Sequence, residues 1–242
     1  MKTTDGVLRE IWLDQPSNEE NTPAHFPRSG AVHCPSSIVP APGQYLLAQA
    51  PADPLTFLPV PLFFAQAAPN GFRCAPALPD SWQPGMVLRL RGPLGHGFTL
   101  PRELRRLGLL ALGETPLRLL ALADLVLRQG GDAALLSTAP LAAHHALPAA
   151  LEIFPPDDIA GLLAWANFLA VDLSPADLPG LRARLKLPPG ACLSIPAQAL
   201  VHTAMPCGGS AECGACAVGL RRRAYALACK DGPVFDLNEL EW

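Results

Sequence analysis

The stretch CGGSAECGAC, residues 207–216, places three cysteines within one short segment, and Cys229 follows further along. The four cysteines have the spacing C-x5-C-x2-C-x12-C, and they are four of the seven in the chain. An apolar core would scatter its cysteines, whereas clustering at short spacings is typical of metal binding. The segment therefore predicts a metal centre with four thiolate ligands, Cys207, Cys213, Cys216 and Cys229.

The arrangement of these cysteines favours a 2Fe-2S cluster. Such a cluster is held by four thiolates, and the plant type has four residues between its first two ligands, where this chain has five. The residues between the ligands are small, so the backbone can bend around a cluster and direct N–H groups at its sulfurs. These small residues are Gly208, Gly209, Ser210, Ala211, Gly214 and Ala215.

Two other interpretations of the four cysteines remain open. A structural zinc site is one, although zinc usually takes its cysteines as two short pairs and only Cys213 and Cys216 form such a pair here. A pair of disulfides is the other, and it would need an oxidising compartment. The N-terminus carries no recognisable signal peptide, so we expect a reducing, cytoplasmic location.

Composition excludes several classes of function. The chain has 242 residues, 50% of them hydrophobic, which is enough for one large core or two small ones. A net charge of −3 without a long basic run predicts no nucleic-acid binding. No stretch is long and apolar enough to predict a membrane span. The lone cysteines Cys34, Cys74 and Cys192 are expected to be reduced and buried.

The first hundred residues are predicted to form a small β-barrel or sandwich. Proline and glycine interrupt short apolar runs there, as is typical of strands joined by turns. Turns are expected at Pro42-Gly43 and Pro84-Gly85. The expected strands are 6–13, 31–34, 44–49, 58–65 and 86–91.

From about residue 101 the pattern changes to alternating strands and helices, which predicts an α/β unit with parallel strands. Residues 107–112 are predicted as a buried strand and 116–129 as a helix, with Pro116 in its first turn. The elements expected after them are strands 133–137 and 151–154, a helix or strand 159–170, and a short helix 178–185. We expect three parts: a barrel at 1–100, an α/β domain at 101–196 and a cluster segment at 197–242.

This order of parts resembles the electron-transfer subunit of the two-subunit, NAD-dependent dihydroorotate dehydrogenase, a ferredoxin-reductase-like family. The resemblance rests on the four-cysteine tail, its ending CKDGPVF at residues 229–235, the turn 42–45 and the loop GPLGHGF at residues 92–98. It implies a ferredoxin-reductase-like β-barrel plus α/β architecture with a C-terminal 2Fe-2S segment. The cluster ligands would be Cys207, Cys213, Cys216 and Cys229.

The resemblance also implies cofactors and a partner. Members of the family carry FAD on the barrel and bind NAD on the α/β domain. Electrons pass through the cluster to a catalytic subunit that contains FMN and oxidises dihydroorotate in pyrimidine biosynthesis. A hetero-oligomer is therefore expected. The loop residues implied to lie near the flavin are Gly92, Pro93, Leu94, Gly95, His96 and Gly97.

Three positions differ from the pattern of the family. An Arg-x-x-Ser type segment of the barrel normally contacts FAD, and Val60 and Phe63 stand at its arginine and hydroxyl positions. A glycine-rich loop normally cradles phosphate after the first strand of the α/β domain, and here Glu114 brings negative charge. These residues predict weak binding of FAD and poorer binding of NAD.

Three hypotheses follow. In the first, the chain is an oxidoreductase subunit that passes electrons between a flavin and a partner through 2Fe-2S. In the second, it is a cluster-bearing relay or assembly subunit of a larger redox complex without FAD or NAD. In the third, it is a zinc-stabilised interaction module. No arrangement of catalytic side chains is recognisable in the sequence.

Overall fold

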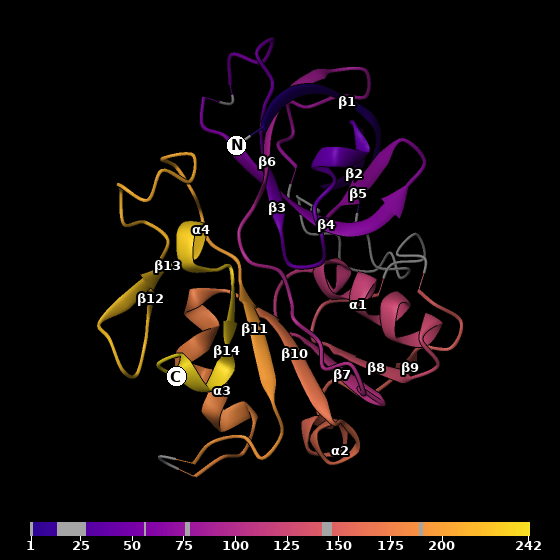
Figure 1. Cartoon of the computed structure of the whole chain (residues 1–242), viewed down its shortest axis with the longest axis vertical. Helices are drawn as coiled ribbons and strands as arrows, with labels where there is room; N and C mark the ends of the chain where they lie inside the picture. The colour runs from indigo at the N-terminus through magenta and orange to yellow at the C-terminus, as the bar shows by residue number, and fades with distance from the viewer. Residues whose placement is uncertain (1, 14–27, 56, 76–77, 142–146, 189–190) are drawn as a thin grey trace, which may run out of the picture.

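We describe the fold from a computed structural model that covers residues 2–13, 28–55, 57–75, 78–141, 147–188 and 191–242. The chain forms a closed barrel, followed by a six-stranded α/β sheet (Figure 1). The C-terminal segment returns to the side of both parts, where it forms a small hairpin and short turns.

The barrel contains six antiparallel strands in the order β1-β2-β5-β4-β3-β6. Side chains alternate between the inside and the outside of such a barrel, so Leu88 and Leu90 are fully buried while Arg89 and Arg91 point outward. Trp82, from the loop before β6, fills the interior. The strands are β1 (Lys2–Leu13), β2 (Arg28–His33), β3 (Tyr45–Gln49), β4 (Val60–Ala68), β5 (Gly71–Cys74) and β6 (Val87–Leu94).

The α/β part has the strand order β14-β11-β10-β7-β8-β9, and only β14 runs antiparallel to its neighbour. Its central parallel strands β7 and β10 are largely apolar and buried, as expected for strands that helices cover, and Asp172 of β10 is a buried exception. The strands are β7 (Arg106–Ala111), β8 (Asp132–Ser137), β9 (Glu152–Ile153), β10 (Phe168–Leu173), β11 (Ala197–Val201) and β14 (Val234–Asp236).

Helix α1 (Leu117–Arg128) lies between the sheet and the barrel and packs directly on β4 (Figure 1). It is buried along most of its length, as expected for a helix with apolar neighbours on two sides. Helices α2 (Ile159–Trp165) and α3 (Leu178–Arg184) complete the α/β part. None of the helices in the described ranges is long and apolar enough to cross a membrane.

The predicted architecture of a barrel plus an α/β sheet is confirmed. Two local details differ from expectation. Residues 159–170 form both elements, since α2 ends at Trp165 and β10 begins at Phe168, where Ala166 takes an extended conformation. Strand β5 was not predicted because it has only four residues and begins with a glycine.

The prediction that all three lone cysteines are buried is wrong for one of them. Cys34 and Cys74 lie in the barrel core, and burial raises the pKa of the Cys74 thiol to about 12. Cys192 is exposed in the loop before β11, where its sulfur lies near the guanidinium of Arg221. A loop position on the surface gives a cysteine no apolar partners, which the sequence around it did not reveal.

Candidate metal centre

The four tail cysteines come from two structural elements, a loop and a short helix. Cys207 and Cys213 lie in the loop that follows β11, and Cys216 ends that loop just before strand β12 (Ala217–Gly219). Cys229 lies in the short helix α4 (Ala228–Asp231). Cys216 and Cys229 are buried, Cys213 is exposed and Cys207 is intermediate.

A hairpin explains the spacing between the last two cysteines. Strand β12 pairs antiparallel with β13 (Tyr225–Leu227), and Ala217 lies opposite Leu227 in the register. The ends of a hairpin meet, so Cys216 and Cys229 become neighbours although twelve residues separate them. The backbone N–H of Ala228 donates to the Cys216 carbonyl at 2.9 Å.

The cysteines are arranged as two pairs. The side chains of Cys207 and Cys213 are hydrogen-bonded to each other, and so are those of Cys216 and Cys229. In a four-cysteine 2Fe-2S centre each iron takes two thiolates, so two neighbouring pairs suit the two irons. Among the described residues, no group of three or more His, Cys, Asp or Glu side chains is arranged to hold a single metal ion.

The thiols of Cys207 and Cys229 differ in their pKa. Hydrogen bonds from the side chains of Ser210 and then Cys213 lower the pKa of Cys207 to about 5. Burial, followed by the interaction with Cys216, raises the pKa of Cys229 to about 12. At neutral pH and without metal, Cys207 is therefore a thiolate and Cys229 a thiol. A metal that binds Cys229 must displace its proton.

The loop that carries the first three cysteines, residues 207–216, depends on left-handed backbone conformations. Gly208 and Gly209 have φ values of +63° and +72°, and Gly214 has +71°. A Cβ atom added at Gly208 would lie 3.2 Å from Pro59 Cγ and 3.3 Å from Arg91 Nη2, whereas one added at Gly214 would meet nothing within 4 Å. Both positions favour glycine for conformation, but only Gly208 is also a close contact with the barrel.

We therefore expect Gly208→Ala to be more damaging than Gly214→Ala. The left-handed conformation costs a residue with a Cβ about 1–2 kcal/mol at either site. Gly208→Ala must in addition move Pro59 or Arg91 away from the loop. Urea unfolding and iron retention of the two purified variants would measure the difference. Equal losses in both would show that the contact with the barrel contributes nothing.

The barrel supplies the surface on which the cysteine segment packs. Tyr45 of β3 is fully buried, and its hydroxyl donates to the Cys229 carbonyl at 3.2 Å. Burial and the neighbouring Cys229 raise the pKa of Tyr45 well above its usual range, so its hydroxyl stays a donor. Leu47, two residues along, is buried beneath Gly209. The metal-binding loop is thus supported by residues that lie far away in the sequence.

The loop 92–97, which was predicted to contact a cofactor, packs against the segment after Cys229. The N–H of His96 donates to the Gly232 carbonyl at 2.6 Å, and His96 Nδ1 lies 3.1 Å from the Asp231 carbonyl oxygen. Gln44 Nε2 donates to the Gly95 carbonyl at 3.0 Å, which ties the loop back to the barrel. In the structure these residues connect the barrel to the chain that carries Cys229.

A buried charge network occupies the point between β7 and β10 where the direction of the strand order reverses. Arg118 of α1 donates to Asp172 Oδ2 at 3.2 Å and to Glu114 Oε1 at 3.2 Å. Arg118 and Asp172 are almost completely buried, and His202 Nδ1 lies 3.2 Å from Asp172 Oδ1. Open α/β sheets usually bind ligands at this point. Here protein side chains occupy it.

The beginning of α1 has little capacity left for a phosphate. Pro116 has no N–H group, and the N–H of Leu117 already donates to Thr115 Oγ1 at 3.2 Å. A Cβ atom added at Gly113 would lie 3.1 Å from His202 Cε1, so the space in front of this glycine is filled. Together with Glu114, these residues do not fit a bound dinucleotide held in the manner of the resembled family.

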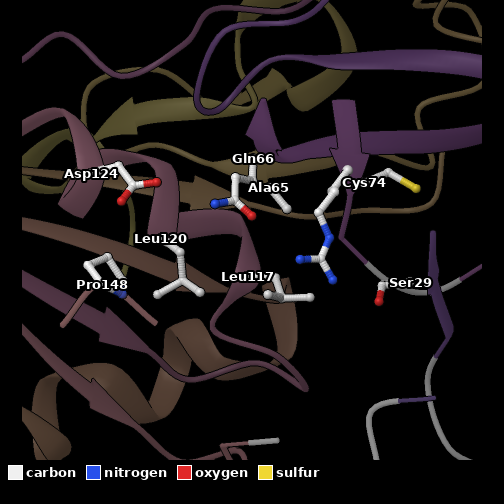
Figure 2. A pocket seen from close by; sticks show the side chains of 9 residues that line it. Ser29, Ala65, Gln66, Cys74, Leu117, Leu120, Asp124 and Pro148 are labelled. Carbon is white, nitrogen blue, oxygen red and sulfur yellow. The ribbon is translucent and has the colours of Figure 1, made fainter. Parts of the chain in front are cut away.

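The two barrel positions implied to contact FAD do not fit that role either. Phe63 is buried, with its ring centroid 5.5 Å from that of Tyr45 and 5.7 Å from the Arg118 guanidinium carbon. The cavity left between β4, β5 and α1 measures about 10 Å³, enough for about one water molecule (Figure 2). Gln66, Leu117 and Leu120 are among the residues that line this cavity.

Val60 lines a different groove, of about 390 Å³, between the start of β4 and the segment before Cys207. None of the described residues that line this groove carries a side chain that could pair with a pyrophosphate. Its lining consists of Leu55, Phe57, Leu58, Pro59, Val60, Pro61, Ala204, Met205 and Pro206.

Solved structures resemble the chain in fold. An NADH-dependent reduced ferredoxin-NADP oxidoreductase, studied for flavin-based electron bifurcation, matches with a TM-score of 0.70 and 16% identity over 98% of this chain and 90% of the other. A ferredoxin-NADP+ reductase from Neisseria gonorrhoeae with bound FAD and NADP matches with a TM-score of 0.54 and 14% identity over 77% and 91%. The ferredoxin reductase of carbazole 1,9a-dioxygenase matches with a TM-score of 0.58 and 14% identity over 78% and 67%. A search of curated proteins gives no match.

The chain therefore has a ferredoxin-reductase-like fold. Residues 202–241 match the family described as the iron-sulfur cluster binding domain of dihydroorotate dehydrogenase B. This matched segment contains all four tail cysteines. The predicted resemblance is confirmed over this segment and in the fold: residues 202–241 are similar to the iron-sulfur cluster binding domain of dihydroorotate dehydrogenase B, and the whole chain is similar in fold to an NADH-dependent ferredoxin-NADP oxidoreductase.

Several residues around the candidate metal centre were not recognised from the sequence. Tyr45, Leu47 and Arg91 lie on barrel strands more than a hundred residues before the cysteines. Arg118 and Asp172 likewise come together only through the pairing of β7 with β10. No spacing or motif links such residues in the sequence. The alternation of side chains along β3 and β6 would have indicated which residues of these strands point outward from the barrel.

Proposed function

We propose that this chain is a one-electron relay that holds a 2Fe-2S cluster on Cys207, Cys213, Cys216 and Cys229. The observation that carries this proposal is the pairing of the four cysteines within the segment that matches the iron-sulfur binding family. A 2Fe-2S cluster exchanges single electrons, so it can connect a two-electron donor such as a flavin to another redox group.

The residues of the chain have defined tasks in this proposal. The four cysteines bind the irons, and the small loop residues leave backbone N–H groups free to face the sulfurs. Tyr45 donates to the Cys229 carbonyl and excludes water from the barrel side of the loop. The loop 92–97 holds the segment after Cys229 in place. Ligand geometry and local hydrogen bonds are the means by which a protein sets a cluster potential.

The electron donor in this proposal is a flavin that another chain holds. This is the second of the sequence hypotheses, and it is favoured by Phe63 beneath Arg118 and by the Arg118–Asp172 pair at the strand-order reversal. The alternative is that the chain binds its own FAD, with contacts from Gly92, Pro93, Leu94, Gly95, His96 and Gly97. The likeness to flavin-binding reductases favours the alternative, and these contacts stay a prediction.

The surface beside Cys207 suits a redox partner. Leu55, Phe57 and Leu58, which precede β4, expose 76%, 81% and 55% of their surface. A hollow of about 500 Å³ lies between Phe57, β6 and Cys207. Exposed apolar side chains that gather at one place mark interaction sites. A catalytic subunit docked here would bring its redox group near the cluster. An FMN-containing subunit similar to dihydroorotate dehydrogenase is the partner that we propose, and the complex would be a hetero-oligomer.

The composition of the anaerobically purified protein tests the proposal. We expect about two irons per chain, the visible spectrum of a 2Fe-2S cluster and no flavin. Iron together with stoichiometric flavin would support the alternative in which this chain binds FAD itself. A colourless protein with one zinc would support a zinc-stabilised interaction module and contradict the redox function.

We also propose that the chain divides into three parts. Residues 1–100 would be the FAD-binding-like barrel, 101–196 the nucleotide-binding-like domain and 197–242 the cluster segment. The last boundary falls at the first residue of β11, which is itself a strand of the α/β sheet. The cluster segment therefore shares its first and last strands, β11 and β14, with the domain before it.

A further inference from the structure

Arg91 lies on the outer face of the barrel, next to the cysteine loop. It is on β6, between Thr3 of β1 and Leu47 of β3 in the strand register. Strand alternation directs Leu90 into the barrel core and Arg91 outward, toward the C-terminal segment. Figure 1 shows this C-terminal segment, in yellow, beside β3 and β6.

The Arg91 guanidinium touches the backbone that surrounds the cluster position. Arg91 Nη2 lies 3.3 Å from a Cβ atom placed on Gly208 and 3.7 Å from one placed on Gly209. These glycines follow Cys207 directly. The positive charge of Arg91 lowers the pKa of the Tyr45 hydroxyl, whereas Cys229, Cys216 and Cys207 raise it. One positive charge therefore lies within the immediate surroundings of the cysteines.

The structure gives Arg91 no carboxylate partner. In the described part of the chain no ion pair involves Arg91, and its register partners Thr3 and Leu47 are uncharged. Its neighbour on the same face, Arg89, differs because Asp5 lies opposite it in the β1 register. Arg91 is partly buried and lines the hollow beside Cys207 and Gly208. Its guanidinium is therefore available to a negatively charged group bound at the cysteine loop.

We infer that Arg91 is the counter-charge of the cluster and sets its reduction potential. This inference rests on the proposed function. A cluster with four thiolates is net negative, and reduction adds one further negative charge. A fixed positive charge beside it stabilises the reduced form more than the oxidised form, which raises the potential. Arg91 acts on the cluster through space and through the Gly208–Gly209 backbone, so it is a positioning residue.

The test compares midpoint potentials of three purified, cluster-loaded variants with wild type. At a fixed applied potential near the midpoint, Arg91→Gln should lower the ratio of reduced to oxidised cluster about tenfold, a shift of about 59 mV to more negative potential. Arg91→Lys keeps the charge and should recover most of this shift. Arg89→Gln removes a charge from the same face but away from the loop, and should change the ratio less than about twofold.

Each outcome separates this inference from the function on which it rests. Iron-loaded wild type and Arg91→Gln proteins with equal potentials would overturn the role of Arg91 and leave the electron-transfer proposal intact. Equal shifts in the Arg91→Gln and Arg89→Gln variants would also overturn it, because position would then be irrelevant. Wild-type protein without iron would overturn both proposals.

Cluster retention gives a second readout that does not depend on potential. If Arg91→Gln loses its cluster to a chelator faster than wild type while Arg91→Lys does not, the charge holds the cluster, which supports the inference. If both variants lose it equally fast, the contribution of Arg91 is packing against Gly208 and not charge. That result would overturn the inference.

Discussion

Replacing Cys229 with serine should remove the cluster, lowering bound iron and visible absorption about tenfold or more. Cys229 is buried, like Cys216, and its carbonyl accepts a hydrogen bond from the Tyr45 hydroxyl, which joins the tail to the barrel. Serine is a poor ligand for iron at neutral pH because its hydroxyl stays protonated. One iron would keep a single protein thiolate, so the chain would hold the cluster less tightly.

The chain provides a matched control for this variant. Cys192→Ser changes a cysteine that is exposed and lies outside the paired set, so we expect iron and absorption equal to wild type. Iron content and the visible spectrum of the three proteins, purified under the same anaerobic conditions, make the comparison. A Cys229→Ser protein that keeps the iron and spectrum of wild type would contradict the ligand set that we propose.

Replacing Asp172 with alanine should destabilise the fold by about 3–5 kcal/mol, because the change leaves the Arg118 guanidinium buried without its main partner. Arg118 and Asp172 have side chains that are 2% and 0% exposed, and they meet at 3.2 Å. Glu114, another partner of Arg118, is 45% exposed and is screened by water. Urea unfolding, followed by circular dichroism, would measure the loss.

Two further variants separate the buried pair from simple loss of charge. Glu114→Gln should cost less than about 1 kcal/mol, as is usual for exposed ion pairs. The double variant Arg118→Met with Asp172→Leu removes both charges and keeps apolar volume, so it should recover most of the stability lost in Asp172→Ala. If Asp172→Ala were as stable as wild type, the charge network would contribute nothing to the stability of the fold.

These stability measurements would show how much the charge network contributes to holding the parts of this fold together. In this chain α1 packs directly on β4, and the charge network bridges α1, β10 and the start of the cluster segment. Such side-chain contacts can take over the bridging that a bound dinucleotide provides. The fold then serves to position the cysteine loop and its partner surface.

Much of the molecule could be predicted from the sequence. The cysteine spacing C-x5-C-x2-C-x12-C indicated a metal centre, and proline and glycine between short apolar runs indicated a barrel. The change to alternating strands and helices after residue 101 indicated the α/β sheet. These features are encoded locally, because turns, helix starts and ligand spacing depend on residues that are close in the chain.

What only the tertiary structure decided is how distant segments meet. The hairpin β12–β13 pairs Cys216 with Cys229, and β3 brings Tyr45 under them. β6 places Arg91 against Gly208, and the parallel pairing of β10 with β7 brings Asp172 to Arg118. None of these contacts has a sequence signature, because they arise from strand pairing and packing between residues tens to hundreds of positions apart. The sequence by itself thus determined that the chain carries a four-cysteine metal centre. The packing of the barrel against the C-terminal segment determined which charges surround the cysteines. The pairing of β7 with β10 determined which side chains occupy the point where the strand order reverses.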